Sequence, residues 1–253
     1  LDYVKVKKYR YKLKISYDGS NYQGWQKQPN KKTIQGELEK NLFKICGNSN
    51  ISVEGSGRTD TGVHAKGQIA HFDSVDKLDN QSIKQSLNCL LCDDIRICTV
   101  NNVSLNFHSR FSAKSKEYRY FICNAKTLSP HIRNYRYHET RELNIKEMQQ
   151  AANLLIGNHD FASFTVNPGY KINNSVREIF TFDINKIDST IIIKVCGNGF
   201  LYKMVRSFTG FLIDVGLGRF DVNYTNDLLM KKKRNKDIKT APAKGLFLWR
   251  VNY

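Results

Sequence analysis

The stretch GSGRTDTGVHAKGQ, residues 55–68, is a shaped loop built around a single carboxylate, Asp60. Glycines on both sides of this acid permit backbone conformations that other residues avoid, and they allow another chain segment or a ligand to approach closely. Strand-like residues precede the loop (Ile51, Val53) and follow it (69–72). We therefore expect two strands to hold both of its ends.

The side chains around Asp60 suit either a turn or a catalytic site. Hydroxyl groups flank the acid (Thr59, Thr61), and Arg58 and His64 add ionisable groups nearby. A neighbouring cation favours the ionised form of a carboxylate, which suits a nucleophile or an electrostatic stabiliser. A hairpin turn whose aspartate caps backbone N–H groups explains the same residues. The loop is neither a dinucleotide fingerprint nor a phosphate loop, because no long helix follows the glycines and no Gly-Lys-Ser/Thr closes it.

Length and charge narrow the class of protein. The chain has 253 residues, which fits two domains of ordinary size. Its net charge is +17, from 40 Lys+Arg against 23 Asp+Glu. So basic a chain favours a polyanionic partner, although charge alone leaves a merely lysine-rich surface equally open. No run of about 18 apolar residues occurs, so we expect no membrane span.

The cysteines indicate a reducing compartment. Residues 1–5 lack the apolar stretch of a signal peptide, and six cysteines are present. We expect these to be free thiols in the cytoplasm. Cys89 and Cys92 have a metal-like spacing, but no second Cys or His pair completes four ligands, so we expect no metal site.

The first half shows the pattern of a small α+β unit. Residues 10–17 alternate between apolar and polar side chains, which predicts a half-buried strand with a basic outer face. A helical pattern runs from the cap Thr33 to Gly47, and a second helix is predicted from about 80 to 91. Together with the other strand-like stretches, the order is β-α-β-β-α-β, as in a ferredoxin-like half.

The second half repeats this mixture. We expect helices at 144–157 and 197–215, with strands between them. Taken alone, Tyr118 is as easily a core aromatic on a strand, and Arg206 lies off its helix's buried stripe, as a solvated cation does. The basic run at 231–234 is typical of a solvated helix face.

Separated stretches of the chain together resemble the tRNA pseudouridine synthase A (TruA) family. The loop at 55–68 carries the likeness most specifically, and the match extends over nearly the whole chain. The other matching stretches are 17–38, 108–113, 116–120, 159–164, 199–206 and 241–251.

The resemblance implies a fold and a reaction. The fold would be α+β, the pseudouridine synthase fold, with two ferredoxin-like (RRM-like) halves whose mixed, mainly antiparallel sheets join into one central sheet flanked by helices and loops. Residues 1–107 would carry the catalytic loop, and residues 108–253 would complete the cleft and the RNA-binding surface. The reaction would convert uridine into pseudouridine in the anticodon stem-loop of tRNA (nucleotides 38–40), with no cofactor and no metal. A homodimer would bind one tRNA with both subunits.

The resemblance also assigns residues. Asp60 would be catalytic, Arg206 would pair with it, and Tyr118 would stack on the flipped uracil and could pass the C5 proton. Arg58 would fill the vacated space or hold phosphate, and Leu246 would wall the pocket. Thr59 and His64 would complete the substrate contacts. Expected RNA-binding residues are Lys12, Lys14, Gln26, Lys66, Arg110 and Lys203.

Three other functions stay open. The same reaction could take place on ribosomal RNA, because the motifs specify the reaction more than the RNA on which it occurs. A catalytically inert RNA-binding protein could share the fold, although the intact Arg58-Thr59-Asp60 run and Arg206 count against it. A hydrolase acting on a nucleoside or glycoside would usually need a second positioned carboxylate, and none is evident beside Asp60.

Overall fold

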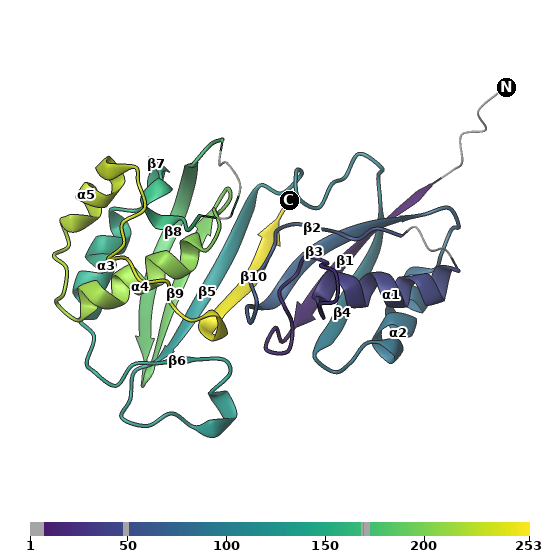
Figure 1. Ribbon diagram of the computed structural model, residues 1–253. Helices are drawn as coiled ribbons and strands as arrows, with labels where there is room; N and C mark the ends of the chain where they lie inside the picture. The colour runs from purple at the N-terminus through teal and green to yellow at the C-terminus, as the bar shows by residue number, and fades with distance from the viewer. Residues whose placement is uncertain (1–7, 48–50, 168, 170–172) are drawn as a thin grey trace. The chain divides into compact units, whose positions relative to one another are not determined.

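The computed structural model describes residues 8–47, 51–167, 169 and 173–253 (Figure 1). The chain folds as two compact units, one of Leu1–Lys114 with Leu248–Tyr253 and the other of Ser115–Phe247. The residue pattern puts the division after residue 107 and leaves the last strand in the second half. The stretch at 1–5, which argues against a signal peptide, lies outside the described residues.

The first unit is a twisted sheet carrying two helices, and its antiparallel strand pairs follow the ferredoxin-like order. In space the strands run β4 (Ile95–Val103), β1 (Tyr9–Tyr17), β3 (His64–Ser74) and β10 (Leu246–Asn252), with the short β2 (Glu54–Gly55) paired to β3.

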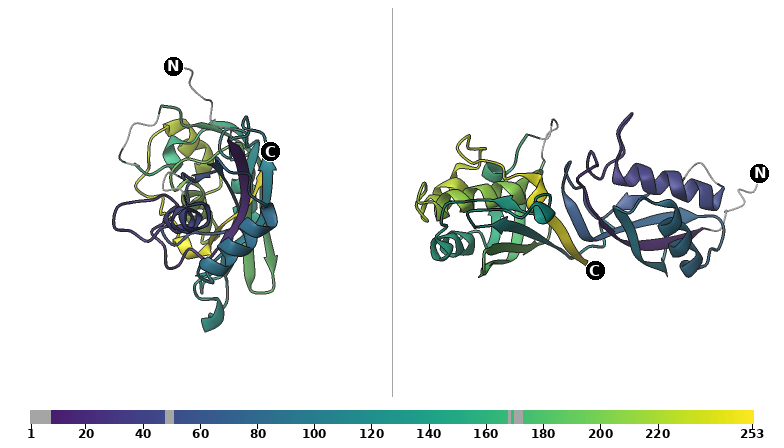
Figure 2. Two further views of the ribbon diagram at one scale, coloured as in Figure 1. Left: turned by 90° about the vertical axis from the view of Figure 1, so that its right-hand side faces the viewer. Right: turned by 90° about the horizontal axis from the view of Figure 1, so that it is seen from below.

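Side-chain burial explains these elements. In β1 the alternate residues Tyr11, Leu13 and Ile15 are fully buried, which confirms the predicted half-buried strand. Two helices, α1 (Ile34–Cys46) and α2 (Asn80–Leu90), contact each other (Figure 2). Each buries apolar side chains on one face. The predicted boundaries of α1 are confirmed, because Thr33 accepts a hydrogen bond from the Gly36 N–H and Gly47 ends the helix with a φ of 64°.

The second unit is a mainly antiparallel sheet with helices and a phenylalanine-rich core. Its strands run in space as β5 (Ser115–Cys123), β9 (Thr190–Gly197), β8 (Val176–Ile187) and β7 (Gly157–Asp160), and β6 (Tyr137–His138) is parallel to β5. The helices are α3 (Ile145–Asn153), α4 (Met204–Gly216) and α5 (Tyr224–Lys231), with short 3₁₀ turns at Pro130–Ile132, Ala162–Phe164 and Ala243–Gly245.

Three predicted boundaries in this unit are wrong. Helix α3 ends at Asn153 instead of 157, because Gly157 with its φ of 111° already opens β7. Helix α4 begins only at Met204, because Lys203 adopts a left-handed conformation. The basic run does not continue a helix face either, since a left-handed Lys232 ends α5 and sends the chain into a loop.

Together these elements form an α+β fold, as expected. Among the residues that the structure describes, no helix combines the length and the apolar character that crossing a bilayer requires.

Candidate active site

The loop around Asp60 is fastened at its base to β3. Strands hold both ends as predicted, although β2 contributes only two residues. The Ser56 N–H donates to the Ile69 carbonyl at 2.7 Å, and the Ser56 hydroxyl donates to Gln68 Oε1 at 2.7 Å. The fully buried Gln68 returns a hydrogen bond from Nε2 to the Gly57 carbonyl at 2.8 Å. The first residues of the loop, Ser56 and Gly57, are therefore both hydrogen-bonded to the Gln68 side chain.

A second segment, Gly24-Trp25, packs against the same loop. The Trp25 N–H donates to the Thr59 carbonyl at 3.0 Å, and the Trp25 side chain is 2% exposed. A β-carbon on Gly55 would lie 2.6 Å from the Trp25 ring. Gly24 and Gly55 are required for this close packing, because a side chain at either position would collide with the neighbouring segment. Gly62 is required for the turn, because its φ is 75°.

Thr59 connects the loop to the core of the first unit. Its hydroxyl is 2.8 Å from the Tyr17 hydroxyl, and both residues are buried. Burial raises the pKa of Tyr17, so its hydroxyl keeps its proton at neutral pH. The Thr59 side chain therefore positions the loop, and its predicted contact with substrate stays a prediction.

His64 lies inside the first unit. Its side chain is fully buried, and its Nδ1 is 3.1 Å from both the Gly19 N–H, which donates to it, and Asp18 Oδ1. A β-carbon on Gly19 would lie 2.0 Å from the Val63 carbonyl oxygen, so the Asp18-Gly19 turn packs tightly on the loop's exit. These contacts brace the loop, whereas the predicted substrate contact of His64 stays a prediction.

Asp60 stands at the start of the loop's last turn. Its carbonyl oxygen accepts a hydrogen bond from the Val63 N–H at 3.1 Å, and the residue is half-buried. Arg58, two residues earlier, is exposed. A carboxylate that keeps some access to solvent, on a backbone fastened from three directions, is preorganised to meet a ligand.

In the second unit, Tyr118 lies on β5 beside a well-packed tyrosine. The Tyr118 side chain is 8% exposed, and its ring meets Phe200 edge-on with centroids 5.1 Å apart. Two residues further along the strand, the Tyr120 hydroxyl donates to the Pro242 carbonyl at 2.8 Å. Leu246, the predicted pocket wall, begins β10 and is 5% exposed.

Arg206 is half-buried on α4 and is not a solvated surface cation. Its Nε donates to the Ala241 carbonyl at 2.8 Å, and the Ala241 N–H donates back to the Arg206 carbonyl at 3.0 Å. Burial raises the pKa of Tyr120, and the positive charge of Arg206 opposes that rise, so the two side chains share one electrostatic environment. The 241–242 segment therefore orients both the arginine and Tyr120.

A basic and aromatic groove lies on the first unit. It has a volume of about 500 Å³, and Lys14, Lys66 and Trp249 line it together with Arg250. The Lys66 Nζ is 4.5 Å from the centroid of the Trp249 ring, a cation–π contact. Two of the expected RNA-binding lysines, Lys14 and Lys66, are thus brought together on one surface, and both are exposed.

The other expected RNA-binding residues occupy separate places. Lys12 lies 5.6 Å from the Phe107 ring centroid, and Gln26 donates to the Gln35 side chain. The exposed Arg110 stacks over Phe111, and Lys203 lies over Tyr202 just before α4. Within the described residues, no group of three or more His, Cys, Asp and Glu side chains could hold a metal ion.

Comparison with known proteins gives one consistent family. The tRNA pseudouridine synthase family matches residues 14–112 and 151–253. The tRNA pseudouridine synthase A of Listeria monocytogenes (strain EGD-e) is 44% identical over 246 residues, 96% of this chain and 99% of that protein. That of Oceanobacillus iheyensis is 43% identical over 244 residues, 96% of each chain. That of Ruminiclostridium cellulolyticum is 44% identical over 243 residues, 96% of this chain and 98% of that protein.

A likeness among solved structures is much weaker. A chain of the archaeal box H/ACA sRNP Nop10–Cbf5 complex matches 80% of this chain with a TM-score of 0.36 and 10% identity. The match covers only 43% of that other chain.

Proposed function

The chain belongs to the tRNA pseudouridine synthase family, and from this premise we propose that it converts uridine into pseudouridine in the anticodon stem-loop of tRNA, with Asp60 as its catalytic carboxylate. It is an isomerase that acts on tRNA and uses no cofactor. The observation that carries the role of Asp60 is its loop, which Gln68, Trp25 and Tyr17 fasten from three sides.

The chemistry suits such a carboxylate. The bond between ribose C1′ and uracil N1 breaks, the base turns, and a new bond forms from C1′ to C5. The ribose carbon becomes electron-poor as the base leaves, so Asp60 either attacks C1′ or removes the adjacent C2′ proton. The C5 proton is lost at the end and N1 gains one, which leaves the overall composition unchanged. The reacting base must first be flipped out of its stack.

The family resemblance assigns further roles to four side chains. Tyr118, held edge-on by Phe200, stacks on the flipped uracil and passes the C5 proton. Arg206, fixed by the Ala241 carbonyl, presents its planar guanidinium to the catalytic carboxylate. Leu246 walls the pocket, and Arg58 fills the space of the flipped base or holds a phosphate.

The same family assignment supports proposals on RNA binding, oligomeric state and cellular location. The groove with Lys14 and Lys66 holds RNA phosphate, and Trp249 offers a ring for stacking. The enzyme works as a homodimer in which one tRNA touches both subunits. Its reaction takes place in the cytoplasm, where its six free cysteines stay reduced.

Pseudouridine mapping of total tRNA and ribosomal RNA tests this function. RNA from cells lacking the enzyme is incubated with the wild type, with Asp60→Asn, and with Asp76→Asn, which removes an exposed acid elsewhere. We expect new pseudouridine in the anticodon stem-loop of tRNA with the wild type and Asp76→Asn only. Near-normal turnover by Asp60→Asn would remove the catalytic role of this acid.

Other outcomes of the same experiment identify the alternatives. New pseudouridine confined to ribosomal RNA would show that the substrate is ribosomal RNA and that the proposed reaction is right. RNA binding without any modified base would indicate an inert RNA-binding protein. Release of free uracil would indicate a hydrolase.

A further inference from the structure

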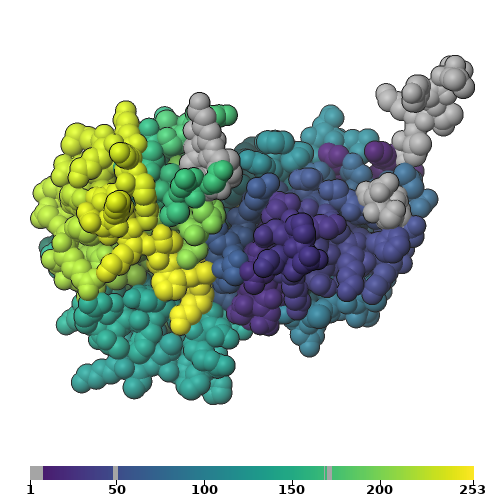
Figure 3. Space-filling view, in the orientation of Figure 1, coloured from purple at the N-terminus to yellow at the C-terminus, as the bar shows by residue number. Residues whose placement is uncertain are grey.

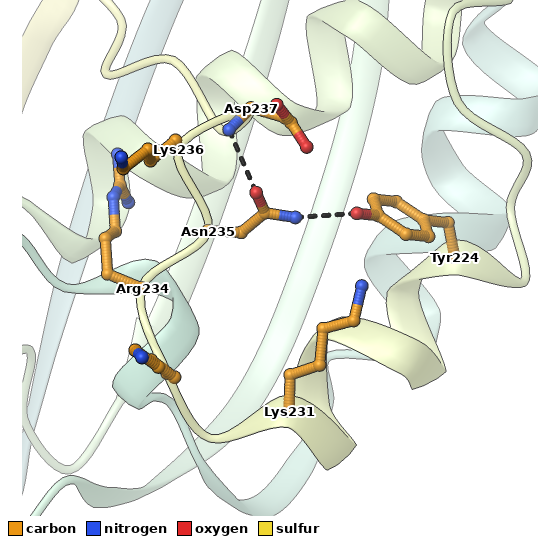
Figure 4. Close-up of a pocket in the computed structure, with 7 residues that line it drawn as sticks. Tyr224, Lys231, Arg234, Asn235, Lys236 and Asp237 are labelled. Atoms are coloured by element: carbon orange, nitrogen blue, oxygen red, sulfur yellow. Dashed lines mark hydrogen bonds between the residues drawn. The ribbon is translucent and has the colours of Figure 1, made fainter.

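A second basic pocket lies in the second unit, after helix α5. It has a volume of about 510 Å³. Four cations, Lys231, Lys233, Arg234 and Lys236, surround it together with Tyr224, Asn235 and one carboxylate, Asp237 (Figure 4). Atoms of the segment after α5 form part of the molecular surface, in yellow in Figure 3.

Arg234 fastens this segment to the core. One of its guanidinium N–H groups donates to the fully buried Ser207 hydroxyl at 2.9 Å, and another donates to the Ile238 carbonyl at 2.6 Å. These two hydrogen bonds use guanidinium donors of Arg234 for contacts inside the protein. Arg234 therefore gives the pocket its shape, and the lysines supply its accessible charge.

Asn235 and Tyr224 form the polar wall. Asn235 Nδ2 donates to the Tyr224 hydroxyl at 2.6 Å, and Asn235 Oδ1 accepts from the Asp237 N–H at 2.9 Å (Figure 4). The Tyr224 ring stacks on Phe220 with centroids 5.0 Å apart, and the Lys231 Nζ lies 5.0 Å from the Tyr224 ring centroid. One lysine is thus directed toward the wall that Asn235 holds.

The three lysines of the pocket carry charge that no acid of the described fold neutralises. Lys231, Lys233 and Lys236 are exposed, and within the described part of the chain none of them forms an ion pair. Like charges gathered at the end of α5 and on the loop after it repel each other, so the arrangement costs free energy when nothing is bound. An ammonium group is a compact point charge that binds phosphate well.

We propose that this pocket binds the phosphodiester backbone of the tRNA substrate, as a docking site in addition to the reacting uridine. The inference rests on the proposed function, because that function supplies the polyanion. Exposed ammonium groups spread along a loop suit an extended polyanion better than a single small anion, which buried donors would enclose. The single acid, Asp237, leaves the pocket strongly positive.

The test compares two triple variants of the full chain that lose the same charge. One carries Lys231→Ala, Lys233→Ala and Lys236→Ala. The matched control carries Lys40→Ala, Lys77→Ala and Lys186→Ala, three exposed lysines that line neither basic pocket. The dissociation constant of a fluorescently labelled tRNA transcript is measured from low to high salt. Thermal melting of both variants checks that the fold is kept.

We expect the pocket variant to bind tRNA about tenfold more weakly at low salt, and the control much less weakly. Each lost phosphate contact reduces the slope of log affinity against log salt by about 0.7–0.9, so the pocket variant should lose about 2 units of slope. Arginine at all three positions should restore most of the affinity, because it keeps the charge. In steady state, KM for tRNA should rise while kcat at saturating tRNA stays unchanged.

Unchanged affinity and salt slope in the pocket variant, or a loss no larger than in the control, would overturn the docking site. Thermal stabilisation of the wild type but not of the pocket variant by inorganic phosphate, together with unchanged tRNA binding by the variant, would also overturn it in favour of a small-anion site. The dissociation constant does not depend on catalysis, so absence of pseudouridine formation by the wild type would refute the proposed function, while the comparison of the two variants would still decide whether the pocket binds tRNA.

Discussion

Gly24 approaches Thr59 so closely that a β-carbon at position 24 would lie 2.6 Å from the Thr59 carbonyl oxygen and 3.1 Å from the carbonyl carbon of Asp60. Gly24 also has a φ of 85°, which other residues rarely adopt. The backbone around residue 24 therefore supports the loop that carries Asp60, and this support requires that position 24 has no side chain.

Gly24→Ala should move the catalytic loop. The left-handed backbone alone costs about 1–2 kcal/mol in an alanine, and the contact with Thr59 forces a displacement on the order of 1 Å, which reduces kcat about 100-fold or more. Gly47→Ala is the control, because Gly47 has a φ of 64° with nothing within 4 Å of an added β-carbon. Melting temperatures and single-turnover rates are measured for both. Equal rates in the two variants would contradict the support.

Tyr118→Phe separates stacking from proton transfer. The variant keeps the ring against Phe200 and loses the hydroxyl, so we expect tRNA affinity to stay and the single-turnover rate to fall about 100-fold or more. Tyr120→Phe is the control for removal of a hydroxyl from the same strand; its bond to the Pro242 carbonyl is worth about 1 kcal/mol of stability, and the bonds between Arg206 and Ala241 remain. An active Tyr118→Phe would assign the C5 proton to another group.

Arg206→Ala should reduce kcat more than tRNA affinity. Removal of one preorganised donor from a charged site typically costs about 100- to 1,000-fold in rate. Arg206→Lys should restore only part, because lysine lacks the planar fork and cannot reproduce the Nε bond to Ala241. Arg133→Ala, which removes an exposed arginine of the same unit, controls for lost charge. Rates like those of the control would take Arg206 out of the active site.

His71 should make the first unit sensitive to acid. Burial lowers the pKa of His71 to about 4, and the electrostatic influence of Arg10 and His108 acts in the same direction while Asp73 opposes it. The unfolded chain takes up a proton near pH 6.5 that the folded chain excludes, so the free energy of unfolding falls as pH drops from about 6.5 to about 4.

Urea unfolding between pH 7 and 4.5 measures this effect. His71→Asn can still accept the Ser109 N–H bond, and its stability should fall less over that range than that of the wild type. His131→Asn, which replaces an exposed histidine, should follow the wild type. Parallel curves for all three proteins would show that His71 does not carry the acid sensitivity.

Local patterns were enough to predict much of the fold. The alternation in β1 and the caps of α1 at Thr33 and Gly47 are decided by neighbouring residues, so they can be seen in the sequence. The start of α4 could not be predicted, because nothing local marks Lys203 as left-handed. The brief β2 was equally hidden, since its pairing depends on β3.

The candidate site divides in the same way. Asp60 stands out because glycines and a single acid cluster in one stretch. The roles of Gln68 and Tyr17 in holding the loop could not be predicted. Gln68 bonds Gly57, which lies 11 positions away in the sequence, and Tyr17 bonds Thr59, 42 positions away, so neither contact leaves a local pattern. The substrate contact expected of His64 stays a prediction. Its burial could not be predicted from the sequence, because it follows from packing against the Asp18-Gly19 turn.

The place of β10 has a consequence for synthesis on the ribosome. Residues 248–253 belong to the first unit, where β10 lies beside β3 and the Tyr253 hydroxyl donates to the Ser109 carbonyl at 2.6 Å. These residues are translated only after the entire second unit. Until β10 has been made, the edge of β3 in the nascent first unit has no neighbouring strand. Such an open edge is a template for pairing with another chain. Translation speed through the second unit thus sets how long the growing chain is exposed to misassembly.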